Sequence, residues 1–246
     1  MVEWYEDERF WTVLYPFLFP AERWASAEAE VDRILAMVNI QSGFALDLCC
    51  GPGRHSVALA KRGLKVTGVD RSPFLLERAR ENGGRAGLEV EWVREDMRRF
   101  VRENAFDLVL NFFTSFGYFD DRNEDVRVLE NVHRSLKPGG ALVMDLVGKE
   151  WVAKVFQPTT SEKLPDGSLL IQRHEIIDEW SRIRNEWIVI QDERVTSFSF
   201  QHTIYSGQEL KDRLARAGFG NIRLYGNLQG KEYGPDAERL VAVARR

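Results

Sequence analysis

The sequence predicts an α/β fold, a doubly wound and mostly parallel sheet of seven strands, from three observations. Short apolar runs of strand length alternate with segments in which apolar residues recur every three or four positions, from residue 44 to residue 150. Glycine and proline turn signals separate these segments. An alternation of strands and helices implies right-handed crossovers, and therefore parallel pairing. The length of 246 residues allows one such domain with an elaboration.

Seven runs have the length and composition of strands. The first, Phe44–Cys49, is apolar almost throughout, which indicates a strand buried on both faces of a parallel sheet. The other six are expected at Lys65–Asp70, Leu88–Val93, Phe106–Leu110, Ala141–Leu146, Asn221–Tyr225 and Arg239–Ala244.

Capping residues mark the helices between these strands. Ser72-Pro73 supplies an N-cap and a first-turn proline for a helix that ends near Gly83. Ser206-x-x-Glu209 is a capping box that opens a helix reaching Gly218. Two further helices are expected, one at Arg54–Arg62 and one along Val126, Leu129, Val132 and Leu136, stopped by Pro138-Gly139-Gly140.

Two regions depart from this alternation. In residues 1–43, seven aromatic residues up to Phe19 are followed by an amphipathic helical pattern from Pro20 to Val38, so we expect an N-terminal helical cap. Residues 151–205 lack helical periodicity and predict an antiparallel β insertion with three strands, at Leu169–Ile177, Ile183–Ile190 and Val195–Tyr205. The core domain is then formed by residues 44–150 and 206–246.

The composition is that of an ordinary globular protein, with 44% hydrophobic and 29% charged residues. The net charge of -4 disfavours nucleic acid as a partner. The apolar run Phe10–Phe19 is too short to cross a bilayer, so no membrane association is expected. Cys49 and Cys50 are adjacent and join no distant segments, which makes the reducing cytoplasm the expected location. No metal site is predicted.

Acidic residues follow three successive strands of the predicted sheet. Asp47 precedes the glycine turn Gly51-Pro52-Gly53, Asp70 ends the second strand, and Asp96 follows the third. Ligands of open parallel sheets bind outside the carboxyl ends of the strands, where a carboxylate can accept hydrogen bonds from ribose hydroxyls. The sequence therefore predicts a ligand that contains a nucleoside.

Two residues distinguish between nucleoside cofactors. A dinucleotide fold needs a third glycine or alanine where this chain has Ser56, and Asp47 places a negative charge beside the loop that would hold a pyrophosphate. An acidic loop suits a ligand that carries an ammonium and a sulfonium, as S-adenosylmethionine does. A nicotinamide dehydrogenase stays an alternative, which binding of NAD would test.

Five segments together resemble the class I S-adenosylmethionine-dependent methyltransferase family, whose fold is Rossmann-like. These segments are Leu46–Gly53, Asp70, Asp96-Met97, Phe106–Asn111 and Leu136–Leu142. The resemblance implies that Asp70 holds the ribose and Asp96 the adenine amino group. The full set of cofactor-binding residues that it implies is Asp47, Cys49, Gly51, Gly53, Asp70, Arg71, Asp96, Met97 and Asn111. Cys49 stands where the family most often has a glycine.

The resemblance implies an enzyme that transfers a methyl group from S-adenosylmethionine, and charge favours a small acceptor. Residues 1–43 hold eight acidic and three basic residues, and residues 151–205 hold eight and six. We therefore expect acidic surfaces around the acceptor, which suit a small neutral or cationic molecule. Methylation of RNA or protein, and cofactor binding without catalysis, are the alternatives.

The catalytic residues are not assigned by the motifs. A general base is needed only if the acceptor arrives protonated, and the candidates for it are Tyr118, His202 and His174. The insertion is expected to form the acceptor site or a subunit interface. In a homodimer, the aromatic residues available for the interface would be Trp180, Trp187, Phe198 and Phe200.

Overall fold

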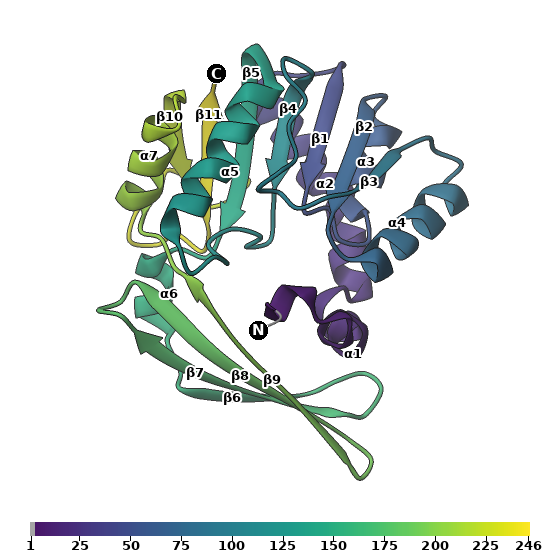
Figure 1. The fold of residues 1–246 in the computed structure, drawn as a ribbon, viewed down its shortest axis with the longest axis vertical. Helices are drawn as coiled ribbons and strands as arrows, with labels where there is room; N and C mark the ends of the chain where they lie inside the picture. Colours follow the sequence, from purple (N-terminus) through teal and green to yellow (C-terminus); the bar gives the residue numbers. More distant parts are fainter. Residues whose placement is uncertain (1–2) are drawn as a thin grey trace.

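The computed structural model describes residues 3–246, which form a seven-stranded sheet with helices on both faces and a second, four-stranded sheet (Figure 1). The strand order of the large sheet is β10-β11-β5-β4-β1-β2-β3. All neighbours pair in parallel except β11, which is antiparallel to both β5 and β10. The bounds are β1 Phe44–Leu48, β2 Lys65–Asp70, β3 Glu91–Arg94, β4 Phe106–Asn111, β5 Leu136–Leu146, β10 Gly220–Tyr225 and β11 Leu240–Arg245.

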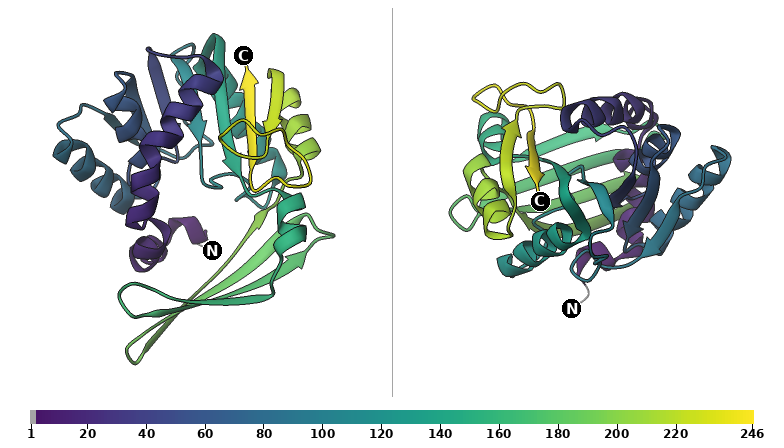
Figure 2. Two further views of the ribbon diagram at one scale, coloured as in Figure 1. Left: turned by 180° about the vertical axis from the view of Figure 1, so that it is seen from behind. Right: turned by 90° about the horizontal axis from the view of Figure 1, so that it is seen from above.

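Side chains that alternate along the strands build a core on each face of this sheet. Leu46 and Leu48 of β1 pack on one side with residues of α5 (Arg122–Ser135) and α7 (Gly207–Arg216). Ala45 packs on the other side with residues of α2 (Ala21–Val38) and α3 (Arg54–Lys61). The two layers of helices are visible from behind and from above in Figure 2. Burial on both faces explains why these strands are nearly all apolar.

The second sheet, the insertion sheet, is antiparallel and lies beyond the carboxyl ends of the parallel strands (Figure 1). Its strands are β6 Thr159–Lys163, β7 Leu169–Ile177, β8 Arg182–Gln191 and β9 Arg194–Thr203. The short helix α6 (Lys149–Val155) leads into it from β5. At the N-terminus, η1 (Trp4–Glu6) and α1 (Glu8–Leu18) occupy the space between the two sheets on the side of α4 (Pro73–Arg85).

Local differences from the expected elements have simple causes. Helix α5 ends at Ser135 rather than at the Pro138 turn, because Leu136 already pairs with Phe106 in the sheet. Strand β3 is limited to four residues, since it pairs only with the last part of β2. No periodic pattern in the sequence predicted α6 or β6, which are short and largely exposed. Within residues 3–246, no helix combines the length and apolar character needed to span a membrane.

Candidate active site

A cavity of about 760 Å³ lies between the carboxyl ends of the parallel strands, the N-terminal segment and the insertion sheet. This volume is in the upper part of the range that small-molecule sites occupy. One wall, which we call the core wall, consists of residues that follow β1, β2 and β3: Asp47–Gly51, Val69–Arg71 and Glu95–Met97. The opposite wall, which we call the outer wall, comes from η1, α1 and the insertion sheet. The cavity is therefore placed where open α/β sheets bind ligands.

Asp47 is buried at the end of β1 and is held by Ser56. The Ser56 hydroxyl donates to Asp47 Oδ2 over 2.6 Å, and burial raises the pKa of this carboxyl. Ser56 stands where a dinucleotide fold has its third glycine, and its hydroxyl binds Asp47. A pyrophosphate held at this loop would therefore lie beside the Asp47 carboxylate.

The turn after β1 requires a left-handed backbone at three residues. Cys49 has a φ of 62°, and Gly51 and Gly53 have φ values of 55° and 84°. A residue with a Cβ adopts this region at a cost of about 1–2 kcal/mol, which explains why glycine is the common choice at the Cys49 position. The Cys49 thiol lies 3.5 Å from the Met97 sulfur, and burial raises its pKa well above the usual value.

Asp70 lies at the end of β2 with both carboxylate oxygens engaged by backbone. Oδ2 accepts from the Gly51 N–H and Oδ1 from the Ser72 N–H, each over 2.9 Å. Burial raises its pKa to about 6, although the two N–H groups act in the opposite direction. The residue lines the cavity, and each of its carboxylate oxygens has a lone pair beyond the one that accepts from the backbone.

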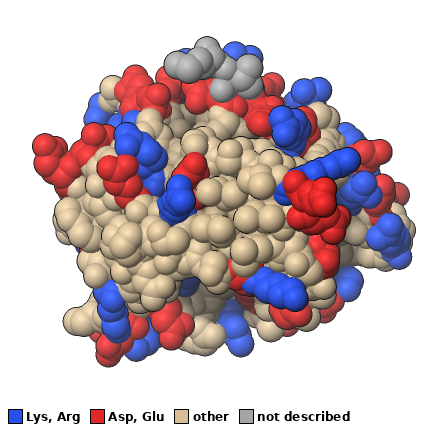
Figure 3. Space-filling view, turned by 90° about the horizontal axis from the view of Figure 1, so that it is seen from below, with Lys and Arg blue, Asp and Glu red and all other residues tan. Residues whose placement is uncertain are grey.

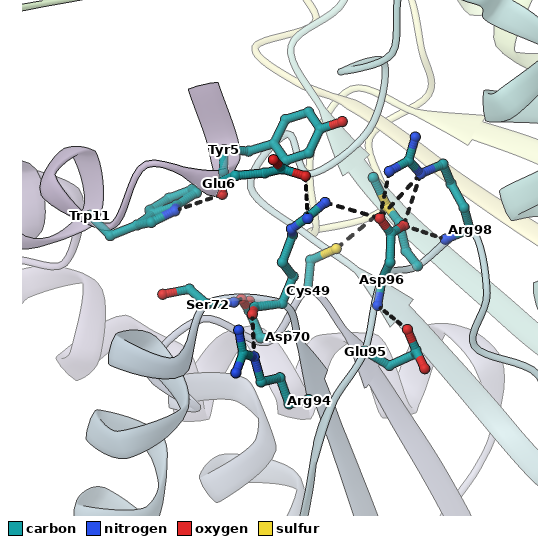
Figure 4. A network of polar contacts seen from close by, with 12 residues as sticks. Tyr5, Glu6, Trp11, Cys49, Asp70, Ser72, Arg94, Glu95, Asp96 and Arg98 are labelled. Atoms are coloured by element: carbon teal, nitrogen blue, oxygen red, sulfur yellow. Dashed lines mark hydrogen bonds and ion pairs between the residues drawn. The ribbon is translucent and has the colours of Figure 1, made fainter. Parts of the chain in front are cut away.

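Asp96 is the centre of an ion-pair network that reaches the N-terminal segment (Figure 4). Arg98 approaches its carboxylate at 2.6 Å, and Arg71 donates to it over 3.0 Å. Arg71 also pairs with Glu6 of η1. Hydrogen bonds from Arg98 outweigh burial and lower the pKa of Asp96. Arg71 therefore joins η1 to the core wall.

Seven of the nine predicted cofactor residues line the cavity, namely Asp47, Cys49, Gly51, Asp70, Arg71, Asp96 and Met97. Gly53 does not; a Cβ there would lie 2.6 Å from the Trp92 ring, so this glycine is needed for packing. Asn111 is also outside the lining and buried, and its amide donates to the carbonyls of Leu48 and Ser115. Asn111 thus fixes the segment after β4 against the end of β1.

Sequence reasoning missed a cationic cluster near the glycine turn. The guanidinium of Arg54 lies 3.7 Å from the centre of the Phe113 ring, and those of Arg23 and Arg239 lie 5.6 Å from it. Glu30 pairs with Arg54, whose buried Nη2 has no partner within residues 3–246. These residues are far apart in the sequence, so no motif could reveal them. Glu95, which also lines the cavity, was visible beside Asp96.

The prediction of acidic surfaces around the acceptor is wrong inside the cavity. The acidic residues of the N-terminal segment form contacts elsewhere: Glu8 accepts from Ser72 and the Phe74 N–H, and Glu28 pairs with Lys61. Among the described residues, those of the N-terminal segment and of the insertion that line the cavity include Arg23 but no Asp or Glu. Charge counts over a segment failed because they do not tell which side chains face inward.

The three candidate bases all line the outer part of the cavity. The Tyr118 and His202 rings lie 6.4 Å apart, and Trp4 packs on Tyr118 at 4.7 Å between ring centres. Burial raises the pKa of Tyr118, so its hydroxyl is protonated at neutral pH. Burial and Arg182 lower the pKa of His202 to about 4, so its imidazole is neutral. His174 Nδ1 lies 2.7 Å from Asn185 Oδ1.

This fold and site define a class of protein. A mostly parallel seven-stranded sheet with antiparallel β11, a glycine turn after β1 and carboxylates after β1, β2 and β3 is the arrangement expected of Rossmann-like enzymes that use S-adenosylmethionine. The family model described as a methyltransferase domain matches residues 45–140. An uncharacterised methyltransferase of Synechocystis sp. is 30% identical over 173 residues, which cover 70% of this chain and 74% of that protein. The chain therefore belongs to the class I S-adenosylmethionine-dependent methyltransferase family.

Two further comparisons agree with this assignment. YqeM of Bacillus subtilis, which carries a methyltransferase name, is 28% identical over 211 residues, 84% of this chain and 85% of that protein. The crystal structure of an S-adenosylmethionine-dependent methyltransferase from Clostridium acetobutylicum ATCC 824 covers 97% of this chain and 98% of its own, with a TM-score of 0.79 and 16% identity. The predictions of fold class, family, enzyme class and cofactor are confirmed.

Proposed function

We propose that this methyltransferase acts on a small molecule that binds in the cavity, between the cofactor on the core wall and the side chains of the outer wall. The observation that carries the proposal is the position of the site: η1, α1 and the insertion sheet lie over the carboxyl ends of the strands and bound a cavity of about 760 Å³. A polymer would need an open groove, and a nucleic acid would need a basic one.

The residues of the core wall fit the cofactor. Asp70 would accept hydrogen bonds from the ribose hydroxyls, and Asp96 and Met97 would meet the adenine. At the other end, Asp47 would favour the ammonium group of the methionine part. The unpartnered Nη2 of Arg54 and the adjacent Arg23 supply the cations that its carboxylate requires.

The protein's part in the chemistry is to align the acceptor and to exclude water. When bound, S-adenosylmethionine supplies an activated methyl group that transfers in line to a nucleophile. The aromatic side chains of Trp4, Tyr118 and Phe200 would hold the acceptor against this methyl group in an environment from which water is displaced. Tyr118, His202 and His174 stay candidates for proton acceptance.

A labelling experiment tests the size of the acceptor. The purified enzyme is incubated with methyl-labelled S-adenosylmethionine and a cell extract, which is then separated by mass. We expect label in the low-mass fraction, and Trp4→Ala should reduce it. Label confined to RNA or protein would contradict the proposal. Bound cofactor with no label in any fraction would favour a non-catalytic role.

We also propose that the outer surface of the insertion sheet pairs with a second copy of the chain. By strand alternation, Ile171, Ile188 and Ile190 point away from the cavity, beside the exposed Leu169 and Val195. Figure 3, which views this side of the molecule, shows a broad uncharged area bordered by charged side chains. Trp187 and Phe200 line the cavity and Phe198 is buried beside Phe10, so they do not serve the interface. Ile188→Lys should lower the molar mass measured by light scattering from that of a dimer to that of a monomer. A wild-type chain that is already monomeric would contradict pairing.

A further inference from the structure

The inner face of the insertion sheet is divided into two parts. In the distal part, Leu170, Val189 and Phe198 pack against Phe10 and Leu14 of α1. In the proximal part, polar side chains replace apolar ones on the same three strands: Gln172 and His174 on β7, Asn185 on β8 and His202 on β9. All four line the cavity. A change from apolar to polar residues on one buried face calls for a polar partner at that place.

His174 and Asn185 are directly opposite each other in the sheet and form one hydrogen-bonded pair. An amide oxygen only accepts, so the contact of 2.7 Å between His174 Nδ1 and Asn185 Oδ1 places the proton on Nδ1. His174 Nε2 then carries a lone pair, and no residue between 3 and 246 donates to it. The pair therefore presents one hydrogen-bond acceptor beside the cavity.

Asn185 provides the matching donor. Its side chain is 3% exposed, and its Nδ2 is buried with no hydrogen-bond partner anywhere in the described chain. A buried amide N–H without a partner is unfavourable, and a ligand oxygen that accepts from it would remove this cost. Rotation of the amide by 180° would exchange the roles of the two residues but would still leave one donor and one acceptor.

Among the described residues, those of the insertion that line the cavity around this pair include no Lys, Arg, Asp or Glu. Phe200 pairs with Asn185 across the sheet, and Trp187 lies two residues further along β8. Arg182 of β8, which is opposite Thr203 rather than His202, is paired with Asp120 and helps to keep His202 neutral. Burial of a carboxylate or an ammonium against this wall would be unfavourable.

We propose that the His174–Asn185 pair is an acceptor-binding subsite that recognises a hydroxyl group on a neutral ring compound. A hydroxyl both donates and accepts, so it can satisfy His174 Nε2 and Asn185 Nδ2 at once. A carboxylate has no proton for His174, and an ammonium has no lone pair for Asn185. The ring itself would pack against Phe200 and Trp187. The inference rests on the proposed small-molecule acceptor and assigns its polar handle.

Four probes that share the toluene skeleton test the subsite. Binding of p-cresol, toluene, p-toluate and p-methylbenzylamine is measured by ligand-observed NMR, with the full chain saturated by S-adenosylhomocysteine. We expect p-cresol to bind at least about fivefold tighter than each of the others, as one buried hydrogen bond predicts. Equal affinities, preference for a charged probe, or no binding of any probe at millimolar concentration would overturn the proposal.

Variants locate the preference. His174→Leu and Asn185→Leu should each remove the advantage of p-cresol over toluene while S-adenosylhomocysteine binds as before. Glu175→Gln is the matched control, because Glu175 is next to His174 but points to the outer surface, where it pairs with Arg184. A preference for p-cresol that survives both leucine variants would refute the assignment. Label found in RNA or protein in the extract experiment would instead refute the small-molecule acceptor, so the two failures are distinguishable.

Discussion

The two walls of the cavity are built on different principles. The core wall carries Asp47, Asp70, Glu95 and Asp96, each placed by the end of a parallel strand. The outer wall is almost free of charge and combines aromatic rings from η1, α1 and the insertion sheet with the polar, uncharged side chains of its proximal part. The first wall suits the charged cofactor that the enzyme family shares, and under the proposed function the second would hold the acceptor. Cofactor and acceptor specificity would then be carried by separate segments.

Removal of the central ring of the outer wall tests whether aromatic packing stabilises that wall. Phe10 is 3% exposed and its ring lies within about 6 Å of those of Trp4, Trp187, Phe198 and Phe200. Phe10→Ala should lower the free energy of unfolding, measured with denaturant, by about 3–5 kcal/mol. The exposed Thr12→Ala on the same helix should change it by less than about 1 kcal/mol. Equal effects of the two variants would show that packing does not hold this wall.

Removal of one carboxylate tests whether the core wall binds the cofactor. Asp70→Ala should weaken S-adenosylmethionine binding at least tenfold in calorimetric titration, because a charge-assisted contact contributes about 1.5–3 kcal/mol. Asp107→Ala is the control. Asp107 lies at the start of β4, pairs with Lys137 and is outside the cavity. An unchanged affinity in Asp70→Ala would count against its role at the ribose.

Titration of Asp70 should make the affinity for the cofactor depend on pH. Burial raises the pKa of Asp70 to about 6, so the carboxyl is protonated in the free protein below that pH. Since the ionised form accepts hydrogen bonds better, cofactor affinity should fall as the pH drops from 7 to 5, by up to about tenfold per pH unit. Asp70→Asn should bind more weakly at neutral pH but with a flat profile. A wild-type profile that is also flat would contradict the assignment.

The smallest effect concerns the two adjacent cysteines. Cys49→Gly relieves a left-handed backbone but loses the contact with Met97 and adds freedom to the unfolded chain. These contributions nearly cancel, so the unfolding free energy should change by less than about 1 kcal/mol. Cys50→Gly removes a buried side chain without relieving strain and should cost at least 1 kcal/mol more. A larger loss of stability in Cys49→Gly than in Cys50→Gly, measured by thermal or denaturant unfolding, would contradict the left-handed backbone at Cys49.

The two walls also differ in how far the sequence predicted them. Strand ends are set by local apolar runs and glycine turns, so seven predicted residues line the core wall. Gly53 and Asn111 belong to the same motifs but serve packing and loop geometry, which a motif does not separate from binding. On the outer wall, β7, β8 and β9 were predicted, but β6 and the placement of the strands against α1 were not. The cluster of Arg23, Arg54 and Arg239 depends on that tertiary placement, as does the pairing of His174 with Asn185.

A crystal structure of the chain with S-adenosylhomocysteine would show whether the carboxylates at the strand ends hold the cofactor. We expect the ribose hydroxyls within hydrogen-bond distance of Asp70 and the adenine beside Asp96. The sulfur should face the rings of Trp4 and Tyr118. A cofactor bound away from these carboxylates, or a sulfur that faces solvent rather than the outer wall, would contradict this expectation.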